Sequence, residues 1–158
     1  MKHEIFTFHI NTVARFVDDY LLYLLARASS LASGAFHARL EALGVTVSTW
    51  RVLAVLDGAG EVTLGELSQR CLFKQPTMTK IVDRLEHLGL VVRSAGTDDR
   101  RQRFVRLSAR GRAEVAGLIE EARRHEARLL SGYTAEERDL LKRSLRDLID
   151  HCRAESAT

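Results

Sequence analysis

The residues with the strongest chemical bias are basic, and they gather in the middle of the chain. Residues 45–112 carry twelve Lys and Arg against seven Asp and Glu, a net charge of +5, whereas the rest of the chain carries a net charge of −2. Seven arginines fall within residues 93–112, against Asp98 and Asp99. A basic middle between neutral-to-acidic ends favours a polyanionic partner for that middle.

Residue sets that carry enzyme chemistry are missing from the sequence. We find no nucleophile with a neighbouring base, no glycine-rich phosphate loop and no acidic cluster for a metal ion. Cys71 and Cys152 lie 81 residues apart and lack the partner spacing of a zinc site. The sequence therefore predicts a protein that is not an enzyme and has no catalytic residues, no cofactor and no metal.

The cysteines and the apolar runs also indicate where the chain works. Two thiols without a disulfide-type pattern fit the reducing cytoplasm. No apolar run approaches the roughly 18 residues that cross a membrane, and the first residues lack the apolar segment of a secretory signal. We expect a cytoplasmic protein without membrane contact.

Apolar residues at a spacing of three to four predict a mainly helical chain, and these helices have to position the basic residues. A first helix is expected from about residue 12 to residue 43, with Ser33-Gly34 as a point where it can kink. A second begins near Ser48, which is a good N-cap. A third runs from Leu64 to about Cys71, after a capping box at Thr63–Glu66.

A fourth helix follows, with Pro76 suited to its first position and Gly89 as its stop. Beyond Gly89 the period of the side-chain pattern changes from about 3.6 residues to two, which predicts short strands at residues 90–93 and 104–107. The polar loop 94–102 between them makes a hairpin with a charged tip. Two further helices are expected near the end of the chain, and their N-caps are Ser108 and Thr134.

Two short helices followed by an arginine-tipped hairpin predict a winged helix-turn-helix. The DNA major groove, about 12 Å wide, admits one helix whose outward side chains bond to base edges and phosphates. An arginine at the hairpin tip can enter the narrow, electronegative minor groove. We therefore expect DNA contacts from polar residues of the fourth helix and of the hairpin, namely Gln75, Thr77, Thr79, Lys80, Arg84, Asp99, Arg100, Arg101 and Arg103.

Plainer interpretations exist for some of these residues. The exposed face of the fourth helix could simply be solvated, and only the neighbouring hairpin favours DNA contact. Asp99 is better suited to pinning the wing through an arginine than to reading bases. Asp83 favours an intrahelical or loop-bracing pair.

The motifs PTMTKIVDRLEHLGLV (76–91) and DDRRQRFVRLS (98–108) occur at a specific distance, and together they resemble the MarR family of bacterial regulators. The motif-bearing part covers about 60 residues, and the flanking helices match the layout of the family. The resemblance implies one MarR-type domain over residues 1–158. It would be mainly α with a small β-hairpin wing: a winged helix-turn-helix at about 45–111, with N- and C-terminal dimerisation helices at about 1–44 and 112–158.

The same resemblance implies an obligate homodimer, formed by the first helix and the last two. It also implies that Arg101 is the minor-groove arginine and that Asp99 orients the wing. Family members commonly repress genes beside their own and leave the DNA when a small phenolic or aromatic acid binds. A dimer is expected to bind double-stranded DNA at a pseudo-palindromic operator, with half-sites about one helical turn apart.

Residues for the effector are harder to place. His9, Arg15 and His37 could line a cleft beside the first helix, although isolated histidines are more often polar surface. Trp50 is most often a core residue, and Arg51 could hold a carboxylate in a bidentate fork or brace the surface or the dimer. Cys71 falls on a packed side, which argues for a structural thiol and against a peroxide sensor.

Two alternatives to a ligand-responsive repressor stay open. One is a winged helix used for protein contact, which the charged wing disfavours because protein interfaces deplete charge at their centre. The other is a regulator without a small-molecule inducer. For the leading interpretation, we expect the effector to change the spacing of the two recognition helices, so that they miss successive major grooves.

Overall fold

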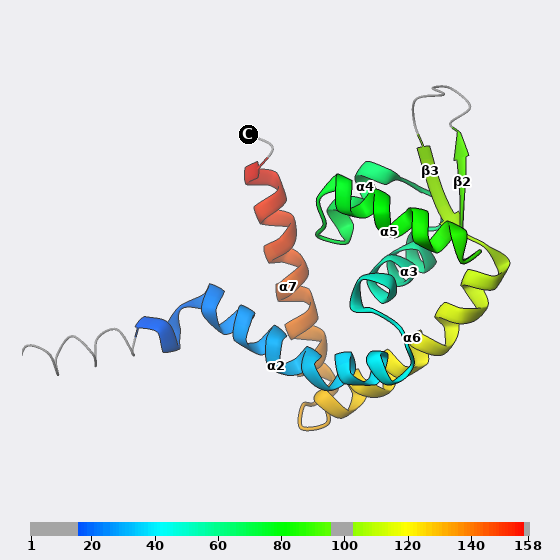
Figure 1. Ribbon diagram of the computed structural model, residues 1–158. Coiled ribbons are helices and arrows are strands. Elements are labelled where there is room, and N and C mark those ends of the chain that lie inside the picture. Colours follow the sequence, from blue (N-terminus) through cyan, green and yellow to red (C-terminus); the bar gives the residue numbers. More distant parts are fainter. Residues whose placement is uncertain (1–15, 96–102, 157–158) are drawn as a thin grey trace, which may run out of the picture. The chain divides into compact units, whose positions relative to one another are not determined.

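The computed structural model describes residues 16–95 and 103–156, and these residues divide into two units, one up to Ile119 and one from Glu120 onward. Figure 1 shows helices with one small sheet, which confirms the mainly α fold with a β wing. In chain order the elements are α2 (Leu21–Ala42), α3 (Val47–Ala59), β1 (Val62–Thr63), α4 (Leu64–Arg70), α5 (Gln75–His87), β2 (Val91–Ala95), β3 (Arg103–Leu107), α6 (Ala109–Leu129) and α7 (Ala135–Ser156).

The expected first helix differs from prediction at its start. Residues 16–19 are helical, but Tyr20 has an extended backbone (φ −78°, ψ 113°), so α2 begins only at Leu21. At Ser33-Gly34 the helix continues, and the Ser33 hydroxyl donates to the Ser29 carbonyl at 2.6 Å. A serine that bonds back to the preceding turn is accommodated within a helix without breaking it.

The second helix begins one residue before the expected N-cap. Thr46 caps α3, because its Oγ1 accepts the backbone N–H of Thr49 at 3.2 Å. Ser48 lies inside the first turn instead, with its hydroxyl 3.0 Å from that of Thr46. Both residues suit an N-cap chemically. In the structure Thr46 is the cap, because its hydroxyl reaches the backbone N–H three residues later.

Residues 47–107, from α3 to β3, form what we call the winged module. Its sheet has three antiparallel strands in the order β1-β3-β2. The sequence indicated β2 and β3, but not β1, which pairs Val62 with Val105 and Thr63 with Phe104. Two residues are too few to show the alternation of side chains that identifies a strand in a sequence. Strand β1 is therefore recognised only by its pairing with β3.

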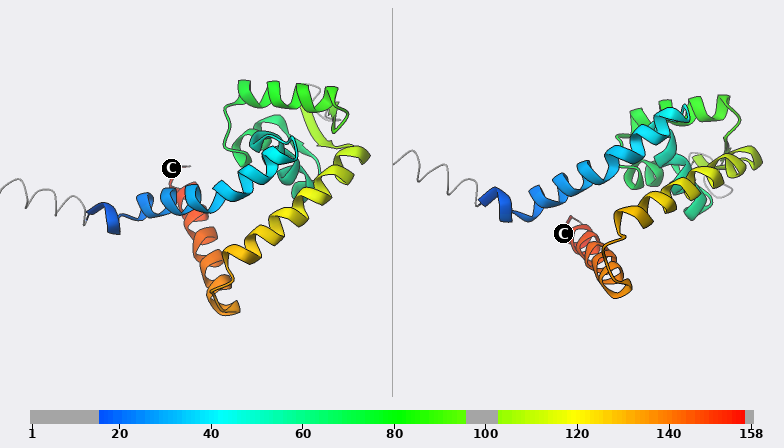
Figure 2. Two further views of the ribbon diagram at one scale, coloured as in Figure 1. Left: turned by 60° about the horizontal axis from the view of Figure 1, so that its bottom comes forward. Right: turned by 90° about the horizontal axis from the view of Figure 1, so that it is seen from below.

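Helix α5 is fixed at its C-terminal end and along one side. Met78, Val82 and Leu85 are fully buried, and α5 lies at the outer edge of the winged module (Figure 2). Gly89, at φ +70°, ends the helix, and the Leu90 N–H returns to the Leu85 carbonyl at 2.9 Å. Such a left-handed cap is the helix stop that glycine favours.

The turn that leads into α5 contains an unusual leucine. Leu72 has φ +59°, in the left-handed region, and its side chain is 82% exposed. A left-handed backbone costs an L-residue with a Cβ roughly 1–2 kcal/mol. Burial does not offset this cost, since the side chain stays in solvent.

The start of α6 packs directly against the residues that follow α5. The Ser108 hydroxyl donates to the Gly89 carbonyl at 2.6 Å, and the Ser108 N–H donates to the Leu90 carbonyl at 3.0 Å. The same hydroxyl accepts the Gly111 N–H at 2.9 Å and so caps α6 as expected. A Cβ added at Gly111 would overlap the Leu90 carbonyl oxygen, so only glycine fits there.

The unit from Glu120 onward is a helical hairpin. Thr134 and Glu137 form the complete capping box that the sequence indicated: the Thr134 N–H donates to Glu137 at 2.8 Å, and Thr134 Oγ1 accepts the Glu137 N–H at 3.2 Å. Lys142 of α7 pairs with Glu126 of α6 at 2.9 Å. The apolar stripe of α7 stays exposed, as do apolar residues near the bend, and this set comprises Leu129, Tyr133, Leu140, Leu141, Leu145 and Ile149.

In the described part of the chain, no single helix has the length and apolarity to cross a membrane. Together α2 and α3 pass a test of length and composition, but they are bent by 98°. Much of α3 is core, since Val52, Leu53 and Leu56 are buried.

We expect Gly111→Ala to destabilise the protein strongly, because the added methyl group overlaps backbone that cannot move without shifting the end of α5. The free energy of unfolding should fall by at least about 2 kcal/mol. Urea denaturation monitored by circular dichroism measures this change.

Gly117→Ala is the matched control, since Gly117 lies in the same helix with open space around its Cβ position. This variant should be unchanged or more stable, by roughly 0.5–1 kcal/mol. Equal effects of the two substitutions would show that the contact at Leu90 does not constrain α6.

Candidate nucleic-acid interface

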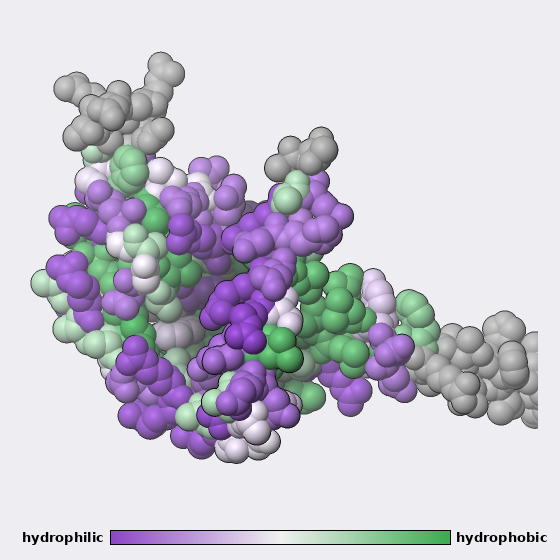
Figure 3. All heavy atoms as spheres, turned by 180° about the vertical axis from the view of Figure 1, so that it is seen from behind, coloured by the Kyte–Doolittle hydropathy of each residue, from purple (hydrophilic) through white to green (hydrophobic). Residues whose placement is uncertain are grey.

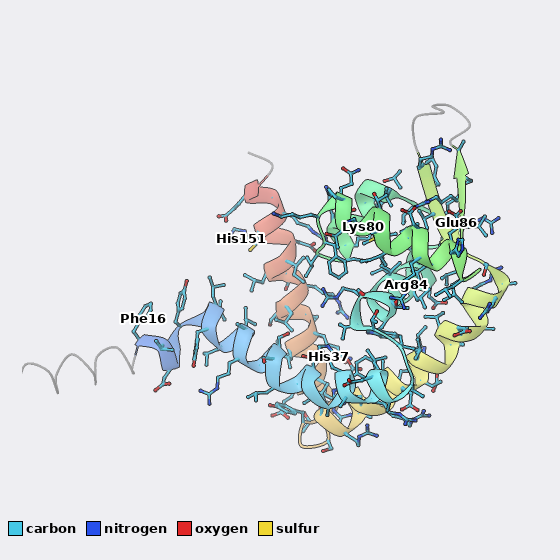
Figure 4. The ribbon with its side chains drawn as sticks, in the orientation of Figure 1. Phe16, His37, Lys80, Arg84, Glu86 and His151 are labelled. Carbon is cyan, nitrogen blue, oxygen red and sulfur yellow. The ribbon has the colours of Figure 1, made fainter. Side chains whose placement is uncertain are left out.

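The outward face of α5 carries most of the helix residues that the sequence predicted to contact DNA. Gln75, Thr77, Lys80 and Arg84 are exposed, while the opposite face lies in the core. Residues 77, 80 and 84 fall three and four apart, so they share one face of the helix. Figure 4 shows Lys80 and Arg84 along α5.

Thr79 is less available than its neighbours. It is half-buried, and its hydroxyl donates to the Gln75 carbonyl of its own helix at 3.0 Å. The oxygen lone pairs remain as acceptors. DNA contact by Thr79 stays a prediction, with a poorer geometry than that of Thr77 or Lys80.

In the described part of the hairpin, Arg103 is exposed at the start of β3, opposite Ala95 of β2. Asp99, Arg100 and Arg101 lie outside the described residues, so their contacts at the wing tip stay predictions. His9 and Arg15, expected near an effector, also lie outside the described residues.

Arg93 is a residue of this interface that the sequence reasoning did not single out. Its guanidinium reaches from β2 to the recognition helix and pairs with Asp83 Oδ1 at 2.6 Å and with Glu86 Oε2 at 3.0 Å. Asp83 therefore braces the wing strand, which fits the loop-bracing alternative and not an intrahelical pair. The sequence signal that could have identified Arg93 was the alternation of side chains along β2. Residues two apart share a face of the strand, so Arg93 lies on the same face as the buried Val91.

The charged side chains of α5 that stay unpaired are cations. Both carboxylates of the helix pair with the single guanidinium of Arg93, whereas Lys80 and Arg84 form no ion pair with any residue that the structure describes. Lys74, the exposed N-cap of α5, is similarly unpaired within that part. Cations along one face and at the N-terminus of a helix offer phosphates a complementary surface.

Arg51 and Trp50 have partners inside the protein. Arg51 Nη1 donates to the Cys71 carbonyl at 3.2 Å, and its guanidinium carbon lies 5.3 Å from the centre of the Phe73 ring. Trp50 is half-buried and packs edge-on against Phe36 at 5.3 Å between ring centres. Arg51 thus ties α3 to the turn before α5, and effector contact by either residue stays a prediction.

His37 is the predicted effector residue that does face a hollow. It lines a pocket of about 610 Å³ between α2 and the start of α3. Glu41 and the capping residue Thr46 share this lining, with Gly34, Ala38, Gly44, Val45 and Val47. Trp50 and Arg51 do not belong to it, so the structure does not gather the three predicted residues into one site.

The thiol of Cys71 is shielded from solvent. It is fully buried, its Sγ donates to the Arg51 carbonyl at 3.7 Å, and burial raises its pKa to about 11, against a smaller lowering by Arg51. Cys152, in contrast, is exposed. Within the described residues no three His, Cys, Asp or Glu side chains are arranged to hold a metal ion.

Comparison with known proteins places this geometry among bacterial regulators. The family model described as "MarR family" matches residues 43–102. The transcriptional repressor IacR of Pseudomonas putida is 30% identical over 128 residues, which are 81% of this chain and 77% of that protein.

Two solved structures share the fold. A MarR family transcriptional regulator from Silicibacter pomeroyi DSS-3 is 44% identical with a TM-score of 0.75, over 87% of this chain and 98% of that one. NadR, crystallised with 4-hydroxyphenylacetate, is 28% identical with a TM-score of 0.74, over 78% of this chain and 88% of that one.

The burial of Cys71 leads to a test by thiol labelling. At about pH 8 the native protein should react with a dithiobenzoate reagent at one thiol, Cys152, because the Cys71 thiolate is both shielded and scarce. In urea both thiols should react. The Cys152→Ser variant is the control and should show no rapid reaction when native; rapid reaction would mean that the winged module opens readily around Cys71.

Proposed function

This chain belongs to the MarR family of winged-helix transcriptional regulators, and we propose that it is a dimeric repressor that leaves its operator when a small aromatic acid binds. The observation that carries the proposal is the recognition helix α5. One side of it is fixed in the core, and the other presents Thr77, Lys80 and Arg84 to solvent, with no ion pair to any of the described residues.

The winged module has the geometry for two kinds of groove contact. A single exposed helix fits the major groove, where threonine and arginine side chains bond to base edges and lysine bonds to phosphate. The hairpin of β2 and β3 extends beside it and presents Arg103. Minor-groove contact by Arg101 completes the proposed interface.

Exposed apolar side chains support the homodimer. In the unit up to Ile119 they gather on α2, over which Figure 3 shows a hydrophobic patch, and on the helical residues 16–19 before it, and they include Phe16, Leu21, Leu22, Leu24 and Leu31. In the other unit they lie on α7 and at the bend before it. A second copy of the chain would bury both sets and present two recognition helices to a pseudo-palindromic operator.

The pocket lined by His37 supports the proposal that a small aromatic acid is the effector. The imidazole N–H of His37 and the N-terminus of α3 can both attract a carboxylate, while the apolar walls suit an aromatic ring. The structure of NadR with 4-hydroxyphenylacetate shows that a relative accommodates such a ligand. In the proposed mechanism, the acid shifts the spacing of the two recognition helices, and a displacement of a few Å suffices to lose one groove.

DNA binding is tested by fluorescence anisotropy on the fragment upstream of this protein's own gene, over a salt series and against a scrambled fragment. We expect tight, salt-dependent binding that favours the native fragment. Lys80→Ala should weaken it by roughly 1–3 kcal/mol and lower the slope of log K against log salt by about two in a dimer. No binding to either fragment at low salt would favour the protein-contact alternative.

Arg153→Ala, which removes an exposed arginine of α7, is the control for net charge. Its affinity and salt slope should match those of the unmodified protein. A loss equal to that of Lys80→Ala would show that long-range charge, and not α5, determines binding.

The effector is tested by adding hydroxylated aromatic acids to the same complex. We expect at least one of them to release DNA, and His37→Ala should raise the concentration required by about tenfold, the equivalent of about 1.4 kcal/mol. His151→Ala, on α7, should leave it unchanged. If saturating acids leave the DNA affinity unaltered, the regulator works without an inducer of this class.

A further inference from the structure

Arg93 stands where the hairpin leaves the body of the winged module. It faces the same side of the sheet as its cross-strand partner Val105 and as Val91 two residues earlier, and both valines are buried against the core. The next pair on this side, Ala95 and Arg103, is exposed. Among the described residues, Arg93 is therefore the last residue of β2 on this side of the sheet that contacts the rest of the module.

The contacts of Arg93 form a fork that closes on one turn of α5. Nη2 meets Asp83 at 2.6 Å and Nη1 meets Glu86 at 3.0 Å. Nη2 also reaches the Thr79 carbonyl at 3.5 Å, and the backbone N–H of Arg93 donates to Glu86 Oε1 at 3.3 Å. With 25% of its side chain exposed, Arg93 is held by the backbone and by a planar guanidinium that cannot rotate freely.

The opposite side of the hairpin has weaker restraints. The Ser94 hydroxyl donates to Glu61 Oε1 at 2.8 Å, and Arg106 Nε lies 3.8 Å from the same oxygen. Both contacts connect the hairpin to the segment just before β1, and neither reaches α5. Of these side-chain contacts, those of Arg93 are the ones that join the hairpin to α5.

We propose that Arg93 is a positioning residue that holds the wing at a fixed direction relative to α5, so that both meet adjacent grooves at once. This inference rests on the proposed DNA-binding function. Arg93 need not touch DNA for this role. The fork acts through the hairpin, and its loss should separate minor-groove contact from major-groove contact.

Footprinting on the operator separates the two contacts. In Arg93→Gln we expect guanine N7 protection from methylation, a major-groove signal, to persist, while minor-groove protection from hydroxyl radicals at the outer edges of the site falls by about tenfold. Arg93→Lys should behave in the same way, since one ammonium cannot hold both carboxylates as the fork does. Full rescue by lysine, or equal loss of both protections, would overturn the proposal.

Arg106→Gln is the matched control. It removes the same charge from the adjacent strand and leaves the fork to α5 intact. Both protections should weaken together and slightly. If Arg106→Gln lost minor-groove protection as selectively as Arg93→Gln, the effect would arise from charge on the hairpin and the proposal would be wrong.

A measurement without DNA distinguishes failure of this inference from failure of the proposed function. Backbone amide order parameters from NMR of the free, full-length protein should fall at residues 94–95 and 103–104 in Arg93→Gln and Arg93→Lys, from about 0.85 toward 0.6. Those of α5 should not change. Unaltered values in the hairpin would overturn the proposal even if operator binding is established, and lowered values would support it even if no operator is found.

Discussion

At Gly111, α6 begins so close to the winged module that an added Cβ would overlap the Leu90 carbonyl group. Ser108 uses its hydroxyl and its N–H to bond Gly89 and Leu90, which lie between α5 and β2, and it caps α6 with the same hydroxyl. The end of α5, the first residue of the wing and the start of α6 are therefore fixed by one set of contacts. The exposed face of α5 has a defined direction because this junction leaves no room for a side chain.

Two arginines extend the same restraint to the rest of the module. Arg51 bonds the turn before α5 to α3, and Arg93 bonds the wing to the middle of α5. Each uses a planar guanidinium to hold groups that come from different elements, which a lysine cannot do in the same way. Basic residues in this chain consequently divide into those that organise the module and those, such as Lys80 and Arg84, that stay available at its surface.

The helical part of this arrangement could be predicted from the sequence because its signals are local. The periodic apolar residues of α5 and the capping box at Thr134 lie within a few positions of one another, and the structure has both. Strand β1 could not be predicted, since its two residues become a strand only through β3. The hydrogen-bond partners of Arg93 and Arg51 were also missed, because they lie 7 to 20 positions away and depend on how the elements pack. The N-cap of α3 was misplaced because Thr46 and Ser48 are chemically equivalent, and only the backbone geometry selects one.

Leu72 has a consequence for how this sequence can change over time. The turn before α5 requires a left-handed residue, and leucine supplies it at an energetic cost with no compensating burial. A lineage that acquires a damaging core substitution elsewhere can regain stability by exchanging this one residue for glycine. The exchange would remove an exposed side chain but none of the hydrogen bonds or ion pairs that hold α5. A substitution at Leu72, which lies outside the core, can thus compensate for the stability lost through a substitution inside the core.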